Sequence, residues 1–492
     1  MSTPDQLDYC TARELSGLLA ARKVSALELA ERAIARIEVH DKRINAVCVC
    51  DFERGRAAAR AADAALARGE RGPLLGLPMT IKEAYNLAGT PTTWGFPAAK
   101  EFRAAEDALA VARAKAAGAV IIGKTNVPLS LADWQSYNDI YGTTNNPWDL
   151  ERTPGGSSGG SSAALAAGYT ALELGSDIGG SLRVPAHYCG VFAHKPSLNL
   201  VPARGHTPPG VPALSYGADL AVVGPMARSA GDLALLLDVV AGPDEAALGI
   251  GYKLALPPPR HDDLKSYRAL LIDTHPLIPT ATSVRKALDR LAEKLGKAGV
   301  KVARASPLLP DLAAAARTYK RLLWSFLASF WPIDIYRNVE VAAKALPADD
   351  DSLAAWRTRA TVLSHRDWIA SDRERARLKK QWADLFCEWD VVLCPPMPTP
   401  AFPHDHTPDQ RVRTIDIDGK AYPYLDQIVW PGVATVAGLP ATAMPIGSSD
   451  EGLPIGVQII GPFLEDRTPL RLAELMEREF GGFVPPPMPI QH

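Results

Sequence analysis

Cysteine is scarce in this sequence, with six residues in a chain of 492. That number excludes the disulfide framework by which small secreted domains are held together. Cys48 and Cys50 lie too close together for the usual spacing of a zinc-binding pair, and no second pair complements them. We therefore expect reduced, partly buried thiols and no metal site.

Long apolar runs are also missing. No stretch of about 18 or more uninterrupted apolar residues occurs, which excludes a spanning helix as an expectation. The first residues, MSTPDQLDYC, lack the charged and apolar regions of a signal peptide. We expect a cytoplasmic protein with no membrane partner.

The chain has no excess charge of either sign. It carries 53 basic and 55 acidic residues, for a net charge of -2. This balance gives no electrostatic basis for binding nucleic acid or an anionic membrane. The hydrophobic fraction of 47% and the charged fraction of 22% are those of an ordinary soluble protein with a sizeable core.

Apolar runs of strand length alternate with segments of helical periodicity along the chain. This alternation predicts an α/β fold with a central mixed, mostly parallel sheet covered by helices on both faces. The expected strands are 77–82, 119–126, 170–177, 267–273, 300–305, 391–395, 441–447 and 453–461. The expected helices lie within 12–40 and at 57–69, 105–118, 161–168, 283–299, 375–390 and about 468–480.

Two clusters of glycine and serine, at 155–162 and 177–181, form the most unusual segment. A phosphate-binding loop is a poor match, because the G-K-[ST] ending is missing. Residues 155–159 match the G-x-S-x-G elbow of α/β-hydrolases, but that elbow requires a strand before the serine and the preceding residues favour a loop. A flexible linker is disfavoured because both clusters adjoin predicted helices or strands.

The remaining interpretation is a serine nucleophile beside an oxyanion hole. Ser181 follows a predicted strand and two glycines whose N–H groups are sterically free. A serine needs a base to remove its proton. His187 and His194 are close in sequence, whereas Lys82 ends an apolar strand, where burial would leave its amine neutral near pH 7.

Taken together, these residues resemble the amidase signature family, which includes fatty acid amide hydrolases and bacterial aryl acylamidases. The GGSSGG and DIGGSLR blocks within 154–185 match its Gly/Ser-rich motif, and Lys82, Ser157 and Ser181 follow at spacings of 75 and 24 residues. Flanking segments agree as well, among them GLPMTIKE, YGTTNNPWD and GLPIGVQIIG. The resemblance implies a single domain over 1–492, with N-terminal helices at about 8–70, a catalytic core at about 71–245 and pocket elements at about 246–484.

The resemblance also implies a role for each matching residue. Lys82 corresponds to the base, Ser157 to a bridging serine held by a cis peptide bond, and Ser181 to the acylated nucleophile. Asp177 and Arg183 are expected to brace the turn, and Ser158 to be a structural hydrogen-bonding residue. The implied oxyanion hole consists of the backbone N–H groups of Ile178, Gly179, Gly180 and Ser181.

The implied reaction is two-step acyl transfer without metal or cofactor, carried out by a monomer or homodimer. Aromatic residues favour a small hydrophobic amide, anilide, ester or carbamate as the substrate. An amidotransferase A-type subunit with glutaminase activity and partner proteins is the alternative, and a scaffold protein is disfavoured because no triad residue is missing. An α/β-hydrolase using His187 or His194 is a third possibility.

Three segments are candidates for the substrate pocket. Within 127–142, Trp134, Tyr137 and Asn138 are candidate pocket residues, although ordinary packing explains each of them equally well. The aromatic run 322–336 fits a pocket wall or a buried amphipathic helix. Segment 401–432 is expected to be a loop at the pocket rim, in which His404 and His406 are solvated rather than metal ligands.

Overall fold

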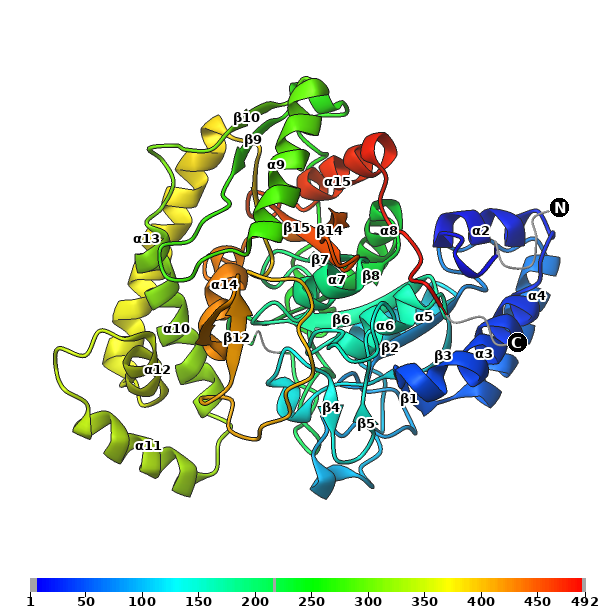
Figure 1. Ribbon diagram of the computed structural model, residues 1–492. Coiled ribbons are helices and arrows are strands. Elements are labelled where there is room, and N and C mark those ends of the chain that lie inside the picture. Colours follow the sequence, from blue (N-terminus) through cyan, green and yellow to red (C-terminus); the bar gives the residue numbers. More distant parts are fainter. Residues whose placement is uncertain (1–6, 216–217, 489–492) are drawn as a thin grey trace.

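A computed structural model describes residues 7–215 and 218–488, and its centre is one sheet of eleven strands (Figure 1). The strands lie in the order β1-β3-β2-β6-β8-β7-β14-β15-β11-β9-β10. Their bounds are β1 Val47–Cys50, β2 Pro78–Lys82, β3 Val120–Thr125, β6 Leu172–Asp177, β7 Phe192–Lys195, β8 Val222–Ala227, β9 Arg268–Leu271, β10 Lys301–Ala303, β11 Val391–Cys394, β14 Ala441–Ser448 and β15 Pro454–Ile460. Two short hairpins stand apart, β4 Tyr137–Asn138 with β5 Gly142–Thr143, and β12 Thr414–Ile417 with β13 Lys420–Pro423.

The expected α/β class with a large mixed sheet is confirmed. Parallel pairing occupies two flanks, in β3-β2-β6 and in β11-β9-β10. The six pairs at β1-β3 and from β6 to β11 are antiparallel, so the parallel share is smaller than the sequence predicted. Strands β7 and β8 and helix α8 Ala230–Val240 were not predicted from the sequence.

Helices cover both faces of this sheet. Successive side chains of a strand point to opposite faces, and in β8 Met226 packs with Leu165 and Leu182 whereas Ala227 belongs to the larger core that includes Leu233. The helices besides α8 are α2 Ala12–Ala20, α3 Ala26–Ile44, α4 Phe52–Ala67, α5 Leu109–Ala116, α6 Gly159–Ala166, α7 Arg183–Cys189, α9 Thr282–Lys297, α10 Leu312–Ala328, α11 Ile333–Ala345, α12 Leu353–Thr361, α13 His365–Glu388, α14 Val429–Thr435 and α15 Arg467–Phe480. Among the described residues, no helix is long and apolar enough to cross a membrane.

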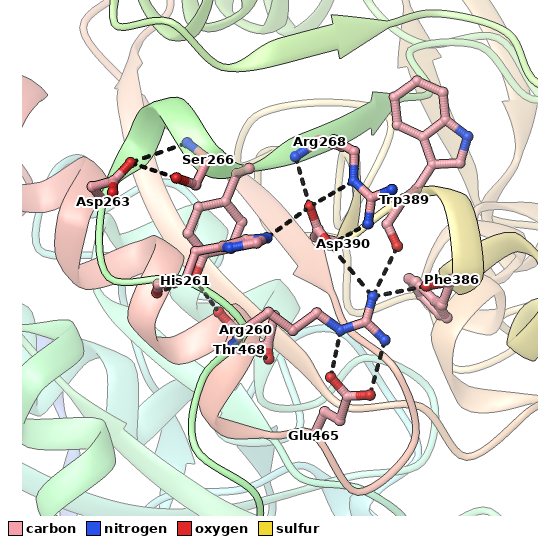
Figure 2. A network of polar contacts seen from close by, with 11 residues as sticks. Arg260, His261, Asp263, Ser266, Arg268, Phe386, Trp389, Asp390, Glu465 and Thr468 are labelled. Carbon is pink, nitrogen blue, oxygen red and sulfur yellow. Dashed lines mark hydrogen bonds and ion pairs between the residues drawn. The ribbon is translucent and has the colours of Figure 1, made fainter.

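A network of polar contacts lies at the starts of β9 and β11, next to the end of α13 (Figure 2). Asp390, whose side chain is 1% exposed, accepts hydrogen bonds from the backbone and guanidinium of Arg268. Arg260 joins Asp390 at 3.4 Å and pairs with Glu465 at 2.6 Å. These contacts fasten the irregular segment before β9 to the end of α13 and to the segment before α15.

Two expectations for the pocket segments are wrong. The buried-helix interpretation of 322–336 holds only to Ala328, where α10 ends; α11 begins at Ile333, which is 63% exposed. Pro332 explains the break, because proline cannot continue a helix at its own position. Segment 401–432 is not a plain loop, since it contains the β12–β13 hairpin and the start of α14. The turn at Asp418-Gly419, with positive φ at both residues, is typical of a two-residue hairpin.

Candidate active site

Lys82 is the last residue of β2 and lies between β3 and β6 in the sheet. Its side chain is fully buried, and its Nζ contacts three serine hydroxyls. The distances are 2.7 Å to Ser157 Oγ, 3.0 Å to Ser158 Oγ and 2.9 Å to Ser176 Oγ. The amine is thus held by hydroxyl groups and has no carboxylate hydrogen-bonded to it among the described residues.

Burial lowers the pKa of Lys82 to about 7, against the opposing charges of Asp177 and Glu173. The cause is desolvation, which disfavours the charged ammonium. Burial also raises the pKa of the Glu173 carboxyl to about 8. A neutral amine offers a lone pair, so Lys82 can accept a proton from a hydroxyl that contacts it at neutral pH.

Ser157 lies just before α6 and is 2% exposed. The peptide bond between Gly156 and Ser157 is cis, as the resemblance implied. Gly156 cannot carry a side chain, because a Cβ there would meet the carbonyl oxygen of Asp133 at 2.3 Å. The residues directly before Ser157 do not form a strand, so Ser157 does not lie in the strand-to-helix turn of a nucleophile elbow.

Ser181 follows β6 and precedes α7, in the turn 178–181. It is 6% exposed, and its backbone carbonyl accepts a hydrogen bond of 3.3 Å from the N–H of Ser158. This bond joins the two Gly/Ser clusters, 155–162 and 177–181. Among the described residues, the hydroxyls of Ser157 and Ser181 are not hydrogen-bonded to each other.

The turn presents N–H groups in the manner of an anion site. Within the described chain, the N–H groups of Ile178, Gly179 and Ser181 have no hydrogen-bond partner, whereas that of Gly180 donates to Asp177 Oδ1 at 2.9 Å. Gly180 has a φ of +97°, a conformation that favours glycine. Three of the four expected donors are therefore free to face a ligand.

Asp177 and Arg183 form the expected ion pair beneath this turn, at 2.9 Å and with both side chains fully buried. Burial alone would raise the pKa of Asp177, but the Arg183 guanidinium, the charge of Lys195 and the hydrogen bond from the Gly180 N–H together hold that pKa below its usual value. Arg183 also donates to Thr435 Oγ1 and Gln458 Oε1, at 2.9 and 2.6 Å. No signal in the sequence pointed to these two partners, which come from α14 and β15, or to Ser176.

The three candidate pocket residues occupy different surroundings. Trp134 donates from Nε1 to the Gly179 carbonyl at 2.8 Å and therefore adjoins the turn. Tyr137 stacks on His406 and accepts a hydrogen bond from Arg413. The Asn138 amide is engaged with Asn126 and with backbone groups at 127, 140 and 141, which favours packing as its role.

An apolar wall near the turn is formed by residues that the sequence analysis did not name as candidate pocket residues. Tyr319 of α10 and Ile428 lie beside Gly179, where a Cβ would be 3.7 Å from the Tyr319 hydroxyl and 3.6 Å from Ile428 Cδ1. Pro431 lies against Gly180 on the other side. Tyr319 lies one helical turn before the aromatic run 322–336 that was expected to form a pocket wall.

The two histidines near Ser181 in sequence are engaged elsewhere. His187 contacts the Thr399 carbonyl and accepts a hydrogen bond from the Gly456 N–H, and burial lowers its pKa to about 4. His194 contacts Thr442 and Asp466. Neither ring contacts a serine hydroxyl in the part of the chain that the structure describes, which removes the geometric basis for a Ser-His-Asp triad there. In the described ranges, no group of three or more His, Cys, Asp or Glu residues could hold a metal ion.

Comparison with known proteins gives matches over nearly the full length. A family model described as Amidase matches residues 28–470. The A-type subunit of the glutamyl-tRNA(Gln) amidotransferase from Anaeromyxobacter sp. (strain K) is 31% identical, over 99% of this chain and 100% of that protein. Fatty-acid amide hydrolase 2 of Homo sapiens is 31% identical, over 96% of this chain and 89% of that protein. The crystal structure of a bacterial aryl acylamidase shares the fold, with a TM-score of 0.79 at 22% identity over 96% of both chains.

Proposed function

This chain belongs to the amidase signature family, and we propose that it hydrolyses small hydrophobic or aryl amides through an acyl-enzyme on Ser181. One observation carries the proposal. The buried, hydroxyl-held amine of Lys82 lies 2.7 Å from Ser157, next to a turn that presents Ser181 and three N–H groups without a partner among the described residues. Groups suited to act as base, bridge, nucleophile and anion site thus lie within one contiguous cluster.

In the acylation step, neutral Lys82 takes the proton of the Ser157 hydroxyl, and Ser157 takes the proton of Ser181. The Ser181 oxygen forms a bond to the substrate carbonyl carbon, and the carbonyl oxygen becomes an oxyanion in front of the turn. When the oxyanion collapses, the C–N bond breaks and the leaving nitrogen receives a proton through Ser157. The relay requires a hydrogen bond between the two serine hydroxyls, which we expect substrate to complete, since catalytic contacts often tighten in the complex.

In the deacylation step, water replaces the amine. Lys82 and Ser157 accept a proton from the water as its oxygen bonds to the acyl carbon. The ester bond to Ser181 then breaks, Ser181 regains a proton and the carboxylic acid leaves. Every proton is moved by residues of this chain, so the proposal requires no cofactor or metal.

The apolar character of the substrate is supported by the residues around the turn. Trp134, Tyr319 and Ile428 surround Gly179, and one similar protein is named as a fatty-acid amide hydrolase. Anilides, carbamates and esters present the same carbonyl to the turn and are included in the proposal. We further propose a cytoplasmic monomer or homodimer whose 492 residues form a single domain, which the family match over 28–470 supports.

A glutaminase component of an amidotransferase is the second candidate. The match to an amidotransferase A-type subunit over 100% of that protein's length favours it. Such a protein would release ammonia from glutamine and would require partner proteins. Hydrolysis of glutamine at a rate above that of any apolar amide, by the chain alone or with a copurifying partner, would favour this candidate over the first.

The test is a hydrolysis screen across aliphatic amides, anilides, carbamates, esters and glutamine, with Ser181→Ala as the blank. We expect turnover of apolar amides or anilides and a loss of about 10⁴-fold or more in kcat for Ser181→Ala. Ser162→Ala is the matched control, because this buried serine of the same cluster has a hydroxyl without a partner among the described residues. Equal turnover by wild type and Ser181→Ala would refute the proposal.

A further inference from the structure

Each carbonyl group of the turn 178–181 is held by a hydrogen bond. The Ile178 carbonyl accepts from the Tyr319 hydroxyl at 2.6 Å, and the Gly179 carbonyl accepts from Trp134 Nε1 at 2.8 Å. The Gly180 carbonyl accepts from the N–H of Val184 at 2.7 Å, and that of Ser181 from the N–H of Ser158 at 3.3 Å. The backbone of the turn is therefore fixed through its four carbonyl groups.

The direction of each carbonyl sets the direction of the following N–H. A trans peptide unit is planar, and its C=O and N–H point in opposite directions. Holding the Ile178 carbonyl thus directs the Gly179 N–H away from Tyr319, and holding the Gly180 carbonyl directs the Ser181 N–H. These two N–H groups are among the three that have no partner in the described chain.

The two carbonyls differ in what holds them. The Gly180 carbonyl is held by the backbone of α7, which no side-chain substitution removes. The Ile178 carbonyl accepts a hydrogen bond from a single side chain of the described residues, Tyr319. The orientation of the Gly179 N–H therefore depends on one phenolic hydroxyl, which belongs to a residue 141 positions after Ile178.

Tyr319 is held in place for this contact. The residue is fully buried in α10, and its ring lies against Gly432 of α14, where a Cβ would meet Tyr319 Cδ1 at 2.5 Å. Burial raises the pKa of the hydroxyl well above its usual value, so the group remains a hydrogen-bond donor. A rigid donor is what an oxyanion site requires, because preorganised groups need no rearrangement as charge develops.

We propose that Tyr319 is a positioning residue for the oxyanion hole: by holding the Ile178 carbonyl, it aims the Gly179 N–H at the reacting carbonyl oxygen. Tyr319 does not touch the reacting atoms and acts through the backbone. This inference rests on the proposed function, because it requires an oxyanion to form in front of the turn.

Tyr319→Phe tests the inference, because it removes the hydroxyl and keeps the ring. With p-nitroacetanilide as the substrate, we expect kcat to fall about 10- to 100-fold, since losing one oxyanion donor outright costs about 10²–10³-fold. KM should change less than about twofold, because the contact strengthens only in the transition state. The rate at which a fluorophosphonate labels Ser181 should fall by a similar factor, which gives a readout independent of substrate choice.

Tyr267→Phe is the matched control. Tyr267 is equally buried and lies just before β9, outside the site; its hydroxyl contacts the His261 carbonyl at 3.2 Å and the Thr468 carbonyl at 3.4 Å. Tyr319→Phe loses one hydroxyl-to-carbonyl contact and Tyr267→Phe loses two, so a purely structural effect would lower the melting temperature of the control at least as much. We expect wild-type kcat and labelling rate in Tyr267→Phe, and an equal loss of activity in both variants would overturn the inference.

Gly432→Ala provides a second route to the same hydroxyl. The added Cβ must push the Tyr319 ring aside, so we expect a loss of kcat without a change in KM. In a double variant with Tyr319→Phe, the two losses should not multiply, because the contact can be lost only once. Fully multiplicative losses, or wild-type kcat in Tyr319→Phe, would overturn the inference. If wild type itself gives neither hydrolysis nor Ser181 labelling, the proposed function fails instead.

Discussion

Two buried lysines end two strands of the same sheet, and only their surroundings distinguish them. Burial lowers the pKa of Lys82 in β2 to about 7, and burial together with Arg183 lowers that of Lys195 in β7 to about 7. The Lys82 amine contacts three serine hydroxyls, whereas that of Lys195 donates to one backbone carbonyl, of Pro196, at 3.1 Å. A carbonyl has no proton to give.

The difference teaches that a lowered pKa does not by itself make a base. Both amines can be neutral at pH 7, but a base must also reach a group that loses a proton in the reaction. In the proposed reaction Ser157 provides that group for Lys82, and its neighbour Ser181 lies on the turn 178–181. Lys195 lies near the ion pair of Asp177 and Arg183 beneath the turn, and near Asp466.

Removing the amine of Lys82 should give the largest effect in this comparison. Lys82→Met retains an unbranched chain of similar length but has no basic nitrogen to accept a proton. We expect kcat to fall about 10²–10⁴-fold, which is the usual contribution of a general base. Steady-state kinetics on an amide measures this fall in kcat, and circular dichroism verifies that the variant folds. Turnover within tenfold of wild type would contradict the role of Lys82 as the base and leave no functional difference between the two lysines.

The pH profile gives the next effect. Lys82 acts as a base when neutral, so kcat/KM should level off about one pH unit above the midpoint and decline below it, approaching about tenfold per pH unit well below the midpoint. The midpoint near pH 7 follows from the lowered pKa of the amine in the free enzyme. A profile that stays flat down to about pH 5 would exclude a neutral lysine as the base.

Lys195→Met should give the smallest effect and sharpens the contrast. We expect kcat within about threefold of wild type and the same midpoint in the pH profile, because no hydroxyl of the described residues contacts this amine. Since the unfolded chain binds the Lys195 proton up to a higher pH than the folded protein, its burial opposes folding near pH 7. The variant's melting temperature at pH 7 should therefore not be lower than that of wild type. A shift of the midpoint in this variant would mean that Lys195, and not Lys82, is the lysine whose titration controls kcat/KM.

Sequence periodicity predicted the strands that carry the chemistry closely. The expected strands 77–82 and 170–177 correspond to β2 and β6, because runs of buried residues bounded by glycine or proline leave little ambiguity. The capping box at Ser25 and Glu28 is also present in α3. Local signals of this kind depend on neighbouring residues alone, so they can be detected without the fold.

Long-range contacts could not be predicted in the same way. Ser176 lies between Gly175 and Asp177 in an ordinary strand. Nothing in the sequence of that strand indicates that the Ser176 hydroxyl contacts Lys82, which lies 94 residues earlier. Tyr319 and Gln458 reach the turn from α10 and β15, after the chain has crossed most of the sheet. The hairpin in 401–432 was missed because its strands are four residues each and one of them ends in proline.

In the proposed mechanism, the order of the chain separates the reacting groups from the residues that recognise the substrate. Lys82, Ser157 and Ser181 fall within 100 consecutive residues, whereas the apolar wall beside them comes from α10 and from residues near 428, contributed by the later half of the sequence. Figure 1 shows α10 to α13 at one end of the molecule and α2 to α4 at the other. Mutations accumulating in that later half can reshape what the enzyme accepts while the reacting groups stay unchanged, so new specificities can evolve on a constant chemistry. Tyr319 is the exception, because it belongs to the wall and also holds the Ile178 carbonyl of the turn. A lineage that replaces it would change the wall and the backbone of the turn together.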